Sequence, residues 1–178
     1  MIRIALAFLL ALFLSAPGSA SAQSAVDLSE GKEEVLSRIP RSLKNASDFT
    51  CLAVTLYHEA RGEGVEGMRA VATVVINRVR TPGRWGDHIC EVVDPTQFTY
   101  FLDEENLIHP PITEYDAWVE ALEVATVIMV EGPDPWLQDA DHYHKTDTNP
   151  TWNRNMVHIE TLQNHIFWAD PEAAKRRG

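Results

Sequence analysis

Residues 51–64 read CLAVTLYHEARGEG, and this stretch decides how the chain begins to fold. Apolar side chains recur through it at helical spacing, which predicts an amphipathic helix over about residues 48–61. Ser47 can accept a hydrogen bond as the N-cap residue, and Asp48 places a negative charge in the first turn, where the helix dipole favours it. The two glycines at the end of the stretch are typical of a helix end.

Glu59 is the residue of this helix that chemistry singles out. On a wheel of 100° per residue it falls roughly 90° from the centre of the apolar stripe, at the rim of the buried face. A carboxyl group held against apolar walls has its charged form disfavoured, so its pKa rises and it can donate a proton near neutral pH. Glycosidases require this of one carboxyl group. The alternative is a boundary residue paired with a neighbouring Lys or Arg.

Two more helices are expected after this one. Residues 65–80 carry apolar side chains in a clean helical pattern, and Pro82-Gly83 closes it. A third helix is expected to follow Thr113, with Asp116 three positions later as an approximate capping box, and to end at Gly132-Pro133.

The pattern changes to an extended one beyond Pro135. We expect strands over residues 142–144 and 156–160, and a hairpin completed by residues 162–168 with its turn near Gln163-Asn164. A helix over residues 154–167 is the competing interpretation. With strands, the fold class is α+β, a helical core with a small C-terminal antiparallel sheet.

Residues 1–22 have the organisation of a signal peptide. Arg3 precedes an apolar run from Ile4 to Leu14, and Ala20-Ser21-Ala22 offers a small-x-small cleavage site. The run is too short to cross a bilayer, which takes about 20 residues. We therefore expect a periplasmic or secreted protein with no stable membrane insertion after cleavage, and an uncleaved anchor is the alternative.

The remaining chain divides into three parts. Residues 23–46 are polar, are broken by Gly31 and Pro40, and are interpreted as an extension with at most one short helix. Residues 47–170 form the folded domain, and residues 171–178 form a solvated tail.

Charge and cysteine content narrow the function classes. The chain has 15 Lys and Arg against 26 Asp and Glu, a formal net charge of −11, which argues against nucleic acid as a partner. Two cysteines cannot make a four-thiolate zinc site. In an oxidising compartment Cys51 and Cys90 are expected to form a disulfide, which would stabilise the fold by about 3–4 kcal/mol.

Several strings together carry a family resemblance. The segment around Glu59, the following helix, Ile89-Cys-Glu-Val-Val and Gln97-Phe-Thr resemble the SleB/CwlJ-type cell wall hydrolases. The strings His142-Tyr-His, Asn149-Pro-Thr-Trp and His165-Ile-Phe-Trp are similar to the closing segment of that family.

This resemblance implies a lysozyme-like fold and a catalytic domain over residues 47–170. It implies cleavage of the β-1,4 bond between N-acetylmuramic acid and N-acetylglucosamine in peptidoglycan, with Glu59 as the catalytic acid. Many members of the family are lytic transglycosylases, in which the C6 hydroxyl of the substrate attacks the anomeric carbon and leaves a 1,6-anhydro sugar. That route uses one carboxyl group as acid and then as base, and the sequence shows no obvious acidic partner for Glu59.

Other polar and aromatic residues are candidates for substrate contacts. A side-chain amide can hydrogen-bond an N-acetyl group, and an aromatic ring can cover a sugar face. These candidates are Gln97, Phe98, His144, Asn149 and Trp152, with Phe98 as a core residue in the alternative interpretation of its loop. The expected partner is the glycan strand of peptidoglycan, and the expected state is a monomer.

A metal-dependent peptidase or amidase acting on wall peptides is the alternative function. It would use His58 with His142 and His144, because residues two apart in a strand face the same side and could share an ion. The sequence indicates no third ligand, and His58 lacks a second histidine at the spacing of a zincin helix. No metal and no other cofactor is therefore expected. A catalytically inactive wall-binding module or inhibitor is a third interpretation.

Overall fold

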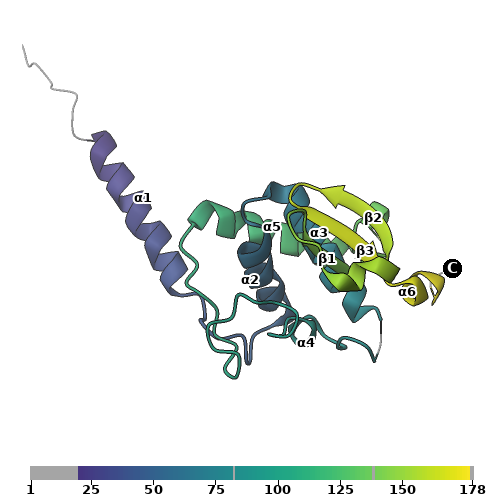
Figure 1. Cartoon of the computed structure of the whole chain (residues 1–178). Coiled ribbons are helices and arrows are strands. Elements are labelled where there is room, and N and C mark those ends of the chain that lie inside the picture. Colours follow the sequence, from purple (N-terminus) through teal and green to yellow (C-terminus); the bar gives the residue numbers. More distant parts are fainter. Residues whose placement is uncertain (1–19, 82, 138, 177–178) are drawn as a thin grey trace, which may run out of the picture.

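The structure is a computed structural model that describes residues 20–81, 83–137 and 139–176. A helical body carries a small sheet on one side, and α1 extends away from the body (Figure 1). The elements in chain order are α1 Ala20–Ser37, α2 Asp48–Ala60, α3 Gly64–Val79, α4 Ile89–Val92, α5 Tyr115–Glu131, η1 Pro135–Leu137, β1 His142–Lys145, η2 Thr151–Asn155, β2 Val157–Leu162, β3 His165–Ala169 and α6 Pro171–Arg176.

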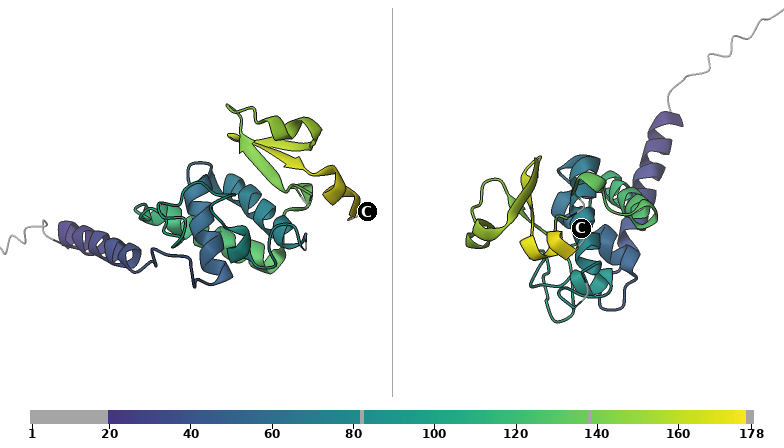
Figure 2. Two further views of the ribbon diagram at one scale, coloured as in Figure 1. Left: turned by 60° about the horizontal axis from the view of Figure 1, so that its bottom comes forward. Right: turned by 90° about the vertical axis from the view of Figure 1, so that its right-hand side faces the viewer.

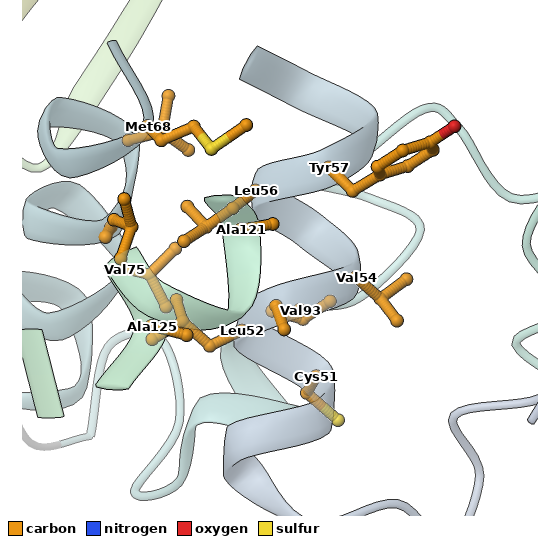
Figure 3. Packing of buried hydrophobic residues seen from close by; sticks show 14 of the residues in the cluster. Cys51, Leu52, Val54, Leu56, Tyr57, Met68, Val75, Val93, Ala121 and Ala125 are labelled. Carbon is orange, nitrogen blue, oxygen red and sulfur yellow. The ribbon is translucent and has the colours of Figure 1, made fainter. Parts of the chain in front are cut away.

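Helix α2 lies in the middle of the helical body. Its apolar stripe packs against α3 and α5, where Leu52 and Leu56 lie near Val75 of α3 and Ala125 of α5 (Figure 3). The helix begins as expected, because the hydroxyl of Ser47 accepts a hydrogen bond from the backbone N–H of Thr50 at 3.2 Å.

Helix α3 is buried on two faces. One face carries the predicted stripe, including Met68 and Val71, into the core shared with α2 and α5. Ala70 and Val74 on another face pack beneath the sheet, together with Phe167 of β3. These short side chains let the sheet lie close to the helix, and the two views of Figure 2 show the sheet on one side of the helical body.

The C-terminal region folds into strands, as expected, and the competing helix over residues 154–167 is wrong. The sheet is antiparallel with the order β1-β3-β2, and the hairpin turns at Gln163, which has a φ of 50°. Strand β3 alternates buried and half-buried side chains, which a helix cannot do over five residues. The α+β fold class, with a helical core and a small C-terminal sheet, is confirmed.

Two details of the helices differ from the expectation. The amides of Thr113 and Glu114 both donate to the hydroxyl of Tyr57 at 3.1 Å, and α5 begins at Tyr115 without a side-chain cap. A tertiary contact thus replaces the predicted capping box. The short helix expected in the extension is instead an 18-residue helix, which begins at Ala20, inside the segment interpreted as the signal peptide. Lys32 of this helix pairs with Asp116 of α5.

The N-terminal part of the chain ties α1 to the body. The guanidinium of Arg41 donates to the carbonyl oxygen of His109 at 2.8 and 3.0 Å. Most of the expected signal peptide, residues 1–19, lies outside the described residues. Within the described ranges, no helix is both long and apolar enough to cross a membrane.

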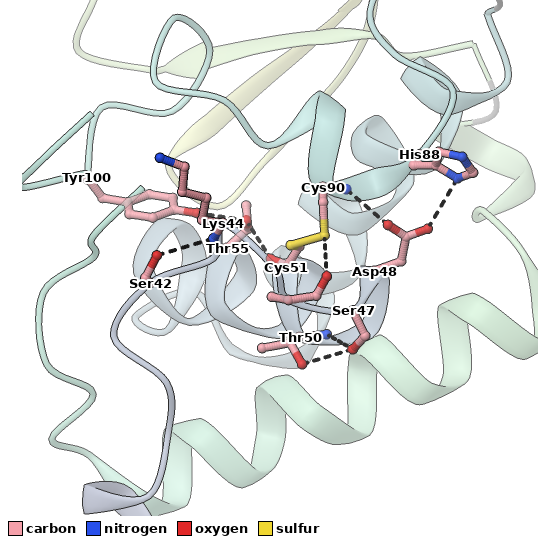
Figure 4. Close-up of a disulfide and its surroundings, with 11 residues drawn as sticks. Ser42, Lys44, Ser47, Asp48, Thr50, Cys51, Thr55, His88, Cys90 and Tyr100 are labelled. Carbon is pink, nitrogen blue, oxygen red and sulfur yellow. Dashed lines mark hydrogen bonds and ion pairs between the residues drawn. A yellow bond between two sulfur atoms is a disulfide. The ribbon is translucent and has the colours of Figure 1, made fainter. Parts of the chain in front are cut away.

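The expected disulfide is present in the structure. Cys51 of α2 and Cys90 of α4 are bonded, with their Cα atoms 5.4 Å apart, as Figure 4 shows. The backbone N–H of Cys90 also donates to the carboxylate of Asp48 at 3.1 Å. The covalent link and this hydrogen bond hold the short α4 against the N-terminal end of α2.

Candidate active site

Glu59 lies in the last turn of α2 and is half buried, at the rim of the core where the wheel placed it. Its Oε2 atom accepts a hydrogen bond of 3.0 Å from the hydroxyl of Tyr143 in β1. Burial raises the pKa of Glu59, while the Tyr143 hydrogen bond and the positive charges of Lys145 and Arg78 oppose that rise. The carboxyl group therefore stays protonated to higher pH than an exposed glutamic acid does.

Tyr143 faces the helices because of strand alternation. Its neighbours His142 and His144 point to the opposite face of the sheet, so the Tyr143 ring turns toward α2. The ring packs against His165 at 5.1 Å and Phe167 at 5.8 Å between centroids. Burial first, and then the negative charge of Glu59, raise the pKa of Tyr143 well above its usual value. Its hydroxyl is thus a permanent donor to Glu59.

Arg78 of α3 is a buried cation whose charge acts on Glu59. The residue is only 5% exposed, and its Nε donates to the backbone oxygen of Asp141 at 2.8 Å. The guanidinium lies over the ring of Trp85 at 4.4 Å and over the ring of Phe98 at 5.7 Å. Two aromatic faces therefore hold this positive charge near the carboxyl group.

His58, the residue before Glu59 in α2, forms a further aromatic contact with Tyr100. Their rings are stacked at 4.8 Å, and His58 Nε2 lies 3.2 Å from His109 Nδ1. Burial is the main cause that lowers the pKa of His58 to about 4, so its ring is neutral at physiological pH. Burial, with a smaller contribution from the charge of Glu59, raises the pKa of Tyr100.

The predicted substrate contacts do not all gather at Glu59. Gln97 is exposed on the loop after α4, and its amide donates to Thr96 Oγ1 at 3.2 Å. Phe98 is 1% exposed and is a core residue beneath Arg78, so the prediction that its ring covers a sugar is wrong. An aromatic ring in a loop gives no sequence signal that separates these two placements.

The remaining three candidates form one cluster on the outer face of the sheet. His144 packs against Trp152, with ring centroids 5.5 Å apart, and the amide of Asn153 reaches both His144 Nε2 at 3.3 Å and Asn149 Oδ1 at 3.4 Å. Tyr143 occupies the inner face of the same strand. His144, Asn149 and Trp152 are therefore separated from the carboxyl group of Glu59 by the sheet.

The histidines of the alternative metal site point apart. His58 contacts His109 within the helical body, whereas His142 lies on the outer face of the sheet and pairs with Asp141 at 2.7 Å. In the part of the chain that the structure describes, no three His, Cys, Asp or Glu side chains are grouped to hold a metal ion.

Sequence reasoning did not select Tyr143 and Arg78. The alternation of residues 142–144 indicated that Tyr143 faces away from the two histidines, and that signal could have directed attention to it. No comparable signal marks Arg78. An arginine in a helical sequence is normally expected to face solvent, and the sequence does not show that this helix is buried on two faces.

Residues 62–168 match the protein family described as cell wall hydrolase. The chain belongs to the cell wall hydrolase family. The match begins three positions after Glu59 and includes both Arg78 and Tyr143.

Two solved structures resemble this cell wall hydrolase. The catalytic domain of the germination-specific lytic transglycosylase SleB from Bacillus anthracis is 28% identical, with a TM-score of 0.53 over 70% of this chain and 95% of that one. The catalytic domain of the Bacillus cereus SleB protein is 29% identical, with a TM-score of 0.51 over 70% and 93% of the two chains. These likenesses confirm the lysozyme-like fold.

Curated relatives point to the same family. The spore cortex-lytic enzyme of Bacillus subtilis is 29% identical over 137 residues, which are 76% of this chain and 42% of that protein. The enzyme of the same name from Halalkalibacterium halodurans is 30% identical over 140 residues, 78% of this chain and 39% of that protein. This cell wall hydrolase thus spans about two fifths of the length of these relatives.

Proposed function

We propose that this protein is an exported lytic transglycosylase that cleaves the bond between N-acetylmuramic acid and N-acetylglucosamine in the glycan strand of peptidoglycan. Family membership supports this proposal, as does the likeness to the catalytic domain of the lytic transglycosylase SleB from Bacillus anthracis. The observation that carries it is Glu59, a half-buried carboxyl group with a raised pKa that is held by the hydroxyl of Tyr143.

In the first half of the reaction, Glu59 acts as the general acid. Because its pKa is raised, it holds a proton that it can pass to the glycosidic oxygen as the bond to the anomeric carbon of the muramic acid breaks. Tyr143 binds Oε2, which leaves Oε1 as the oxygen that faces the leaving group. The developing carboxylate is stabilised by the same hydrogen bond and by the charges of Arg78 and Lys145.

In the second half, the carboxylate acts as the general base. It takes the proton from the C6 hydroxyl of the muramic acid while the C6 oxygen bonds to the anomeric carbon, which closes the 1,6-anhydro ring. The proton that Glu59 gave away is thereby restored, and no water is consumed. One residue serves both halves, and the opposing influences on its pKa suit a group that must be acid and base in turn.

The charges around Glu59 support this route over hydrolysis. A hydrolase of the inverting or retaining type needs a second carboxylate about 5–9.5 Å from the first. The charged groups that shift the pKa of Glu59 are two cations, Lys145 and Arg78. The nearest acid in sequence, Glu63, accepts a hydrogen bond from the backbone of Asn164 at 3.1 Å.

Export is proposed from the sequence of residues 1–22 together with the disulfide. A disulfide between Cys51 and Cys90 fits an oxidising compartment outside the cytoplasm, which is also where peptidoglycan lies. We propose that the protein acts in the periplasm or on the outside of the cell.

The test is the release of soluble glycan fragments from purified sacculi. The wild-type protein is expected to release them with or without a chelator, and E59Q, which removes only the titratable proton, is expected to release none. Loss of activity with the chelator, or release of free peptides in place of glycan fragments, would support the metal-dependent peptidase and contradict the proposal.

A further inference from the structure

A hollow of about 290 Å³ opens beside the proposed acid, and of the residues that line it only Lys145 takes part in the mechanism above. Three segments line it: the turn between α2 and α3, the end of β1 with the loop after it, and the turn between β2 and β3. The lining residues are Glu63, Lys145, Thr146, Asp147 and Asn164.

The hollow is adjacent to Glu59 along two elements. Lys145 follows Tyr143 by two residues in β1, so the two side chains share a face and their Cα atoms are about 7 Å apart. Glu63 follows Glu59 by four residues, and its N–H donates to the carbonyl oxygen of Ala60 at 2.9 Å, which keeps it about one turn further along. A group attached to a sugar at Glu59 can therefore reach the hollow.

Hydrogen bonds fix the walls of the hollow. The carboxylate of Glu63 accepts from the N–H of Asn164 at 3.1 Å, and the N–H of Thr146 donates to the carbonyl oxygen of Asn164 at 2.8 Å. The carbonyl oxygen of Lys145 accepts from both the N–H and the hydroxyl of Thr148, at 3.0 and 2.8 Å. The three segments are tied together, so the hollow is preformed, as small-ligand sites usually are.

The lining offers charges of both signs. Lys145 and Asp147 are exposed, while Glu63 is half-buried and already accepts a hydrogen bond from the backbone N–H of Asn164. The sugar rings of a peptidoglycan strand present uncharged hydroxyl and acetamido groups. These groups form no ion pairs with the Lys145 ammonium or the Asp147 carboxylate. The stem peptide carries free carboxylates and an amine, and it is attached to the muramic acid, the sugar whose anomeric carbon reacts.

We propose that this hollow is a subsite for the stem peptide of the muramic acid undergoing cleavage, with Lys145 facing a peptide carboxylate and Asp147 facing a peptide amine. This inference rests on the proposed function. It makes the enzyme prefer glycan strands that carry stem peptides over strands from which an amidase has removed them.

The test compares these two substrates by the ratio of their kcat/KM values for the release of anhydro-ended fragments. The wild-type ratio is expected to favour stem-bearing strands by about tenfold, the range of one or two hydrogen bonds to charged groups at a partly exposed site. D147K is expected to lower the ratio to nearly one. K145M also changes the pKa of Glu59, because it removes a positive charge that acts on this carboxyl group. That effect is the same for both substrates and cancels in the ratio. The ratio is therefore expected to fall in K145M as well.

The matched control is E123K, which makes the same change of charge on the exposed face of α5 and is expected to keep the wild-type ratio. A soluble stem pentapeptide supplies a readout without catalysis, because it is expected to shift the amide NMR signals of residues 145–147 in wild type and not in D147K. Equal ratios in wild type, D147K and K145M would overturn the subsite and leave the proposed function standing. Absence of anhydro-ended fragments from both substrates would overturn the two together.

Discussion

The hydroxyl of Tyr143 lies 3.0 Å from Oε2 of Glu59, although 84 positions separate the two residues in the chain. One belongs to the first strand of the sheet and the other to the central helix. The proposed acid therefore has its position and its proton affinity set by how the sheet packs on α3. Any change that loosens this packing is expected to act on catalysis before it acts on the helical core.

Replacing Tyr143 with phenylalanine tests this relationship. Y143F removes a donor that stabilises the Glu59 carboxylate, so the pKa of Glu59 rises further and the base half of the reaction loses its support. We expect kcat to fall about 10- to 100-fold, the range for a hydrogen bond to a charged group. We also expect the descending limb of the pH–kcat profile to move to higher pH.

Tyr115 of α5 provides the control, because its ring contacts Lys32 of α1 and it belongs to a helix rather than to the sheet. Y115F is expected to keep the wild-type pH profile. A Y143F profile that superimposes on the wild type would contradict the role given to this hydroxyl.

The difference in stability between E59Q and the wild-type protein should depend on pH, because only the wild type carries a titratable group at this position. The folded protein raises the pKa of Glu59, so the folded state binds this proton more tightly than the unfolded state does. The protonated Glu59 therefore adds to the free energy of unfolding at pH values below its unfolded pKa of about 4.3. This stabilisation is lost as the pH rises through its pKa in the folded state. A glutamine does not titrate, and the Tm of E59Q minus that of wild type is expected to grow from pH 4 to pH 8.

Thermal unfolding followed by circular dichroism measures this difference. E123Q, a change on the exposed face of α5, is expected to show no such trend with pH. An E59Q protein that becomes progressively less stable than wild type toward pH 8 would mean that Glu59 is a paired structural carboxylate.

The titration of His58 lowers the stability of the folded protein as the pH falls, which is the opposite direction to that of Glu59. Its folded pKa of about 4 lies below the unfolded value of about 6.5, so the unfolded state takes up a proton first as the pH falls. Stability is therefore lost between pH 6.5 and pH 4, and H58Q is expected to lose less Tm over this window than wild type. H158Q, at an exposed position of β2, is expected to follow the wild-type slope, and an identical slope in H58Q would refute the assignment.

The disulfide between Cys51 and Cys90 should carry a large share of the stability. It closes a loop of 39 residues, which corresponds to about 4 kcal/mol in the chain-entropy treatment. The double variant C51S/C90S is expected to unfold roughly 10 °C below wild type. A reductant should lower the Tm of wild type by a similar amount and leave the double variant unchanged, and insensitivity of wild type to reductant would contradict this.

The periodic parts of the fold could be predicted from sequence because local patterns determine them. The stripes of α2 and α3 and the alternation of β3 each follow from a repeat that the buried face requires. Ser47 was predicted as a cap for the same reason, since the hydrogen bond it makes spans only three residues. The cap of α5 was predicted wrongly, because the hydroxyl of Tyr57 accepts hydrogen bonds from the amides of Thr113 and Glu114, 56 and 57 residues away.

The candidate site was predictable only in its acid. The rim position of Glu59 follows from one helix, whereas Tyr143 and Arg78 reach it from other elements through long-range packing. Phe98 shows the same limit, because the Arg78 guanidinium over its ring is a contact between distant segments. The spacing of residues along the chain predicts which side chains lie on the same face of a helix or strand. It does not predict which distant segment packs against that face.

In the proposed mechanism the C6 hydroxyl of the substrate takes the place of water as the nucleophile, and Glu59 is both acid and base. Mass spectrometry of peptidoglycan digested by the wild-type protein in ¹⁸O-enriched water tests it most directly. We predict 1,6-anhydro-muramic ends that carry no ¹⁸O, and no glycan fragments from E59Q under the same conditions. Reducing ends labelled with ¹⁸O, or undiminished cleavage by E59Q, would contradict the account.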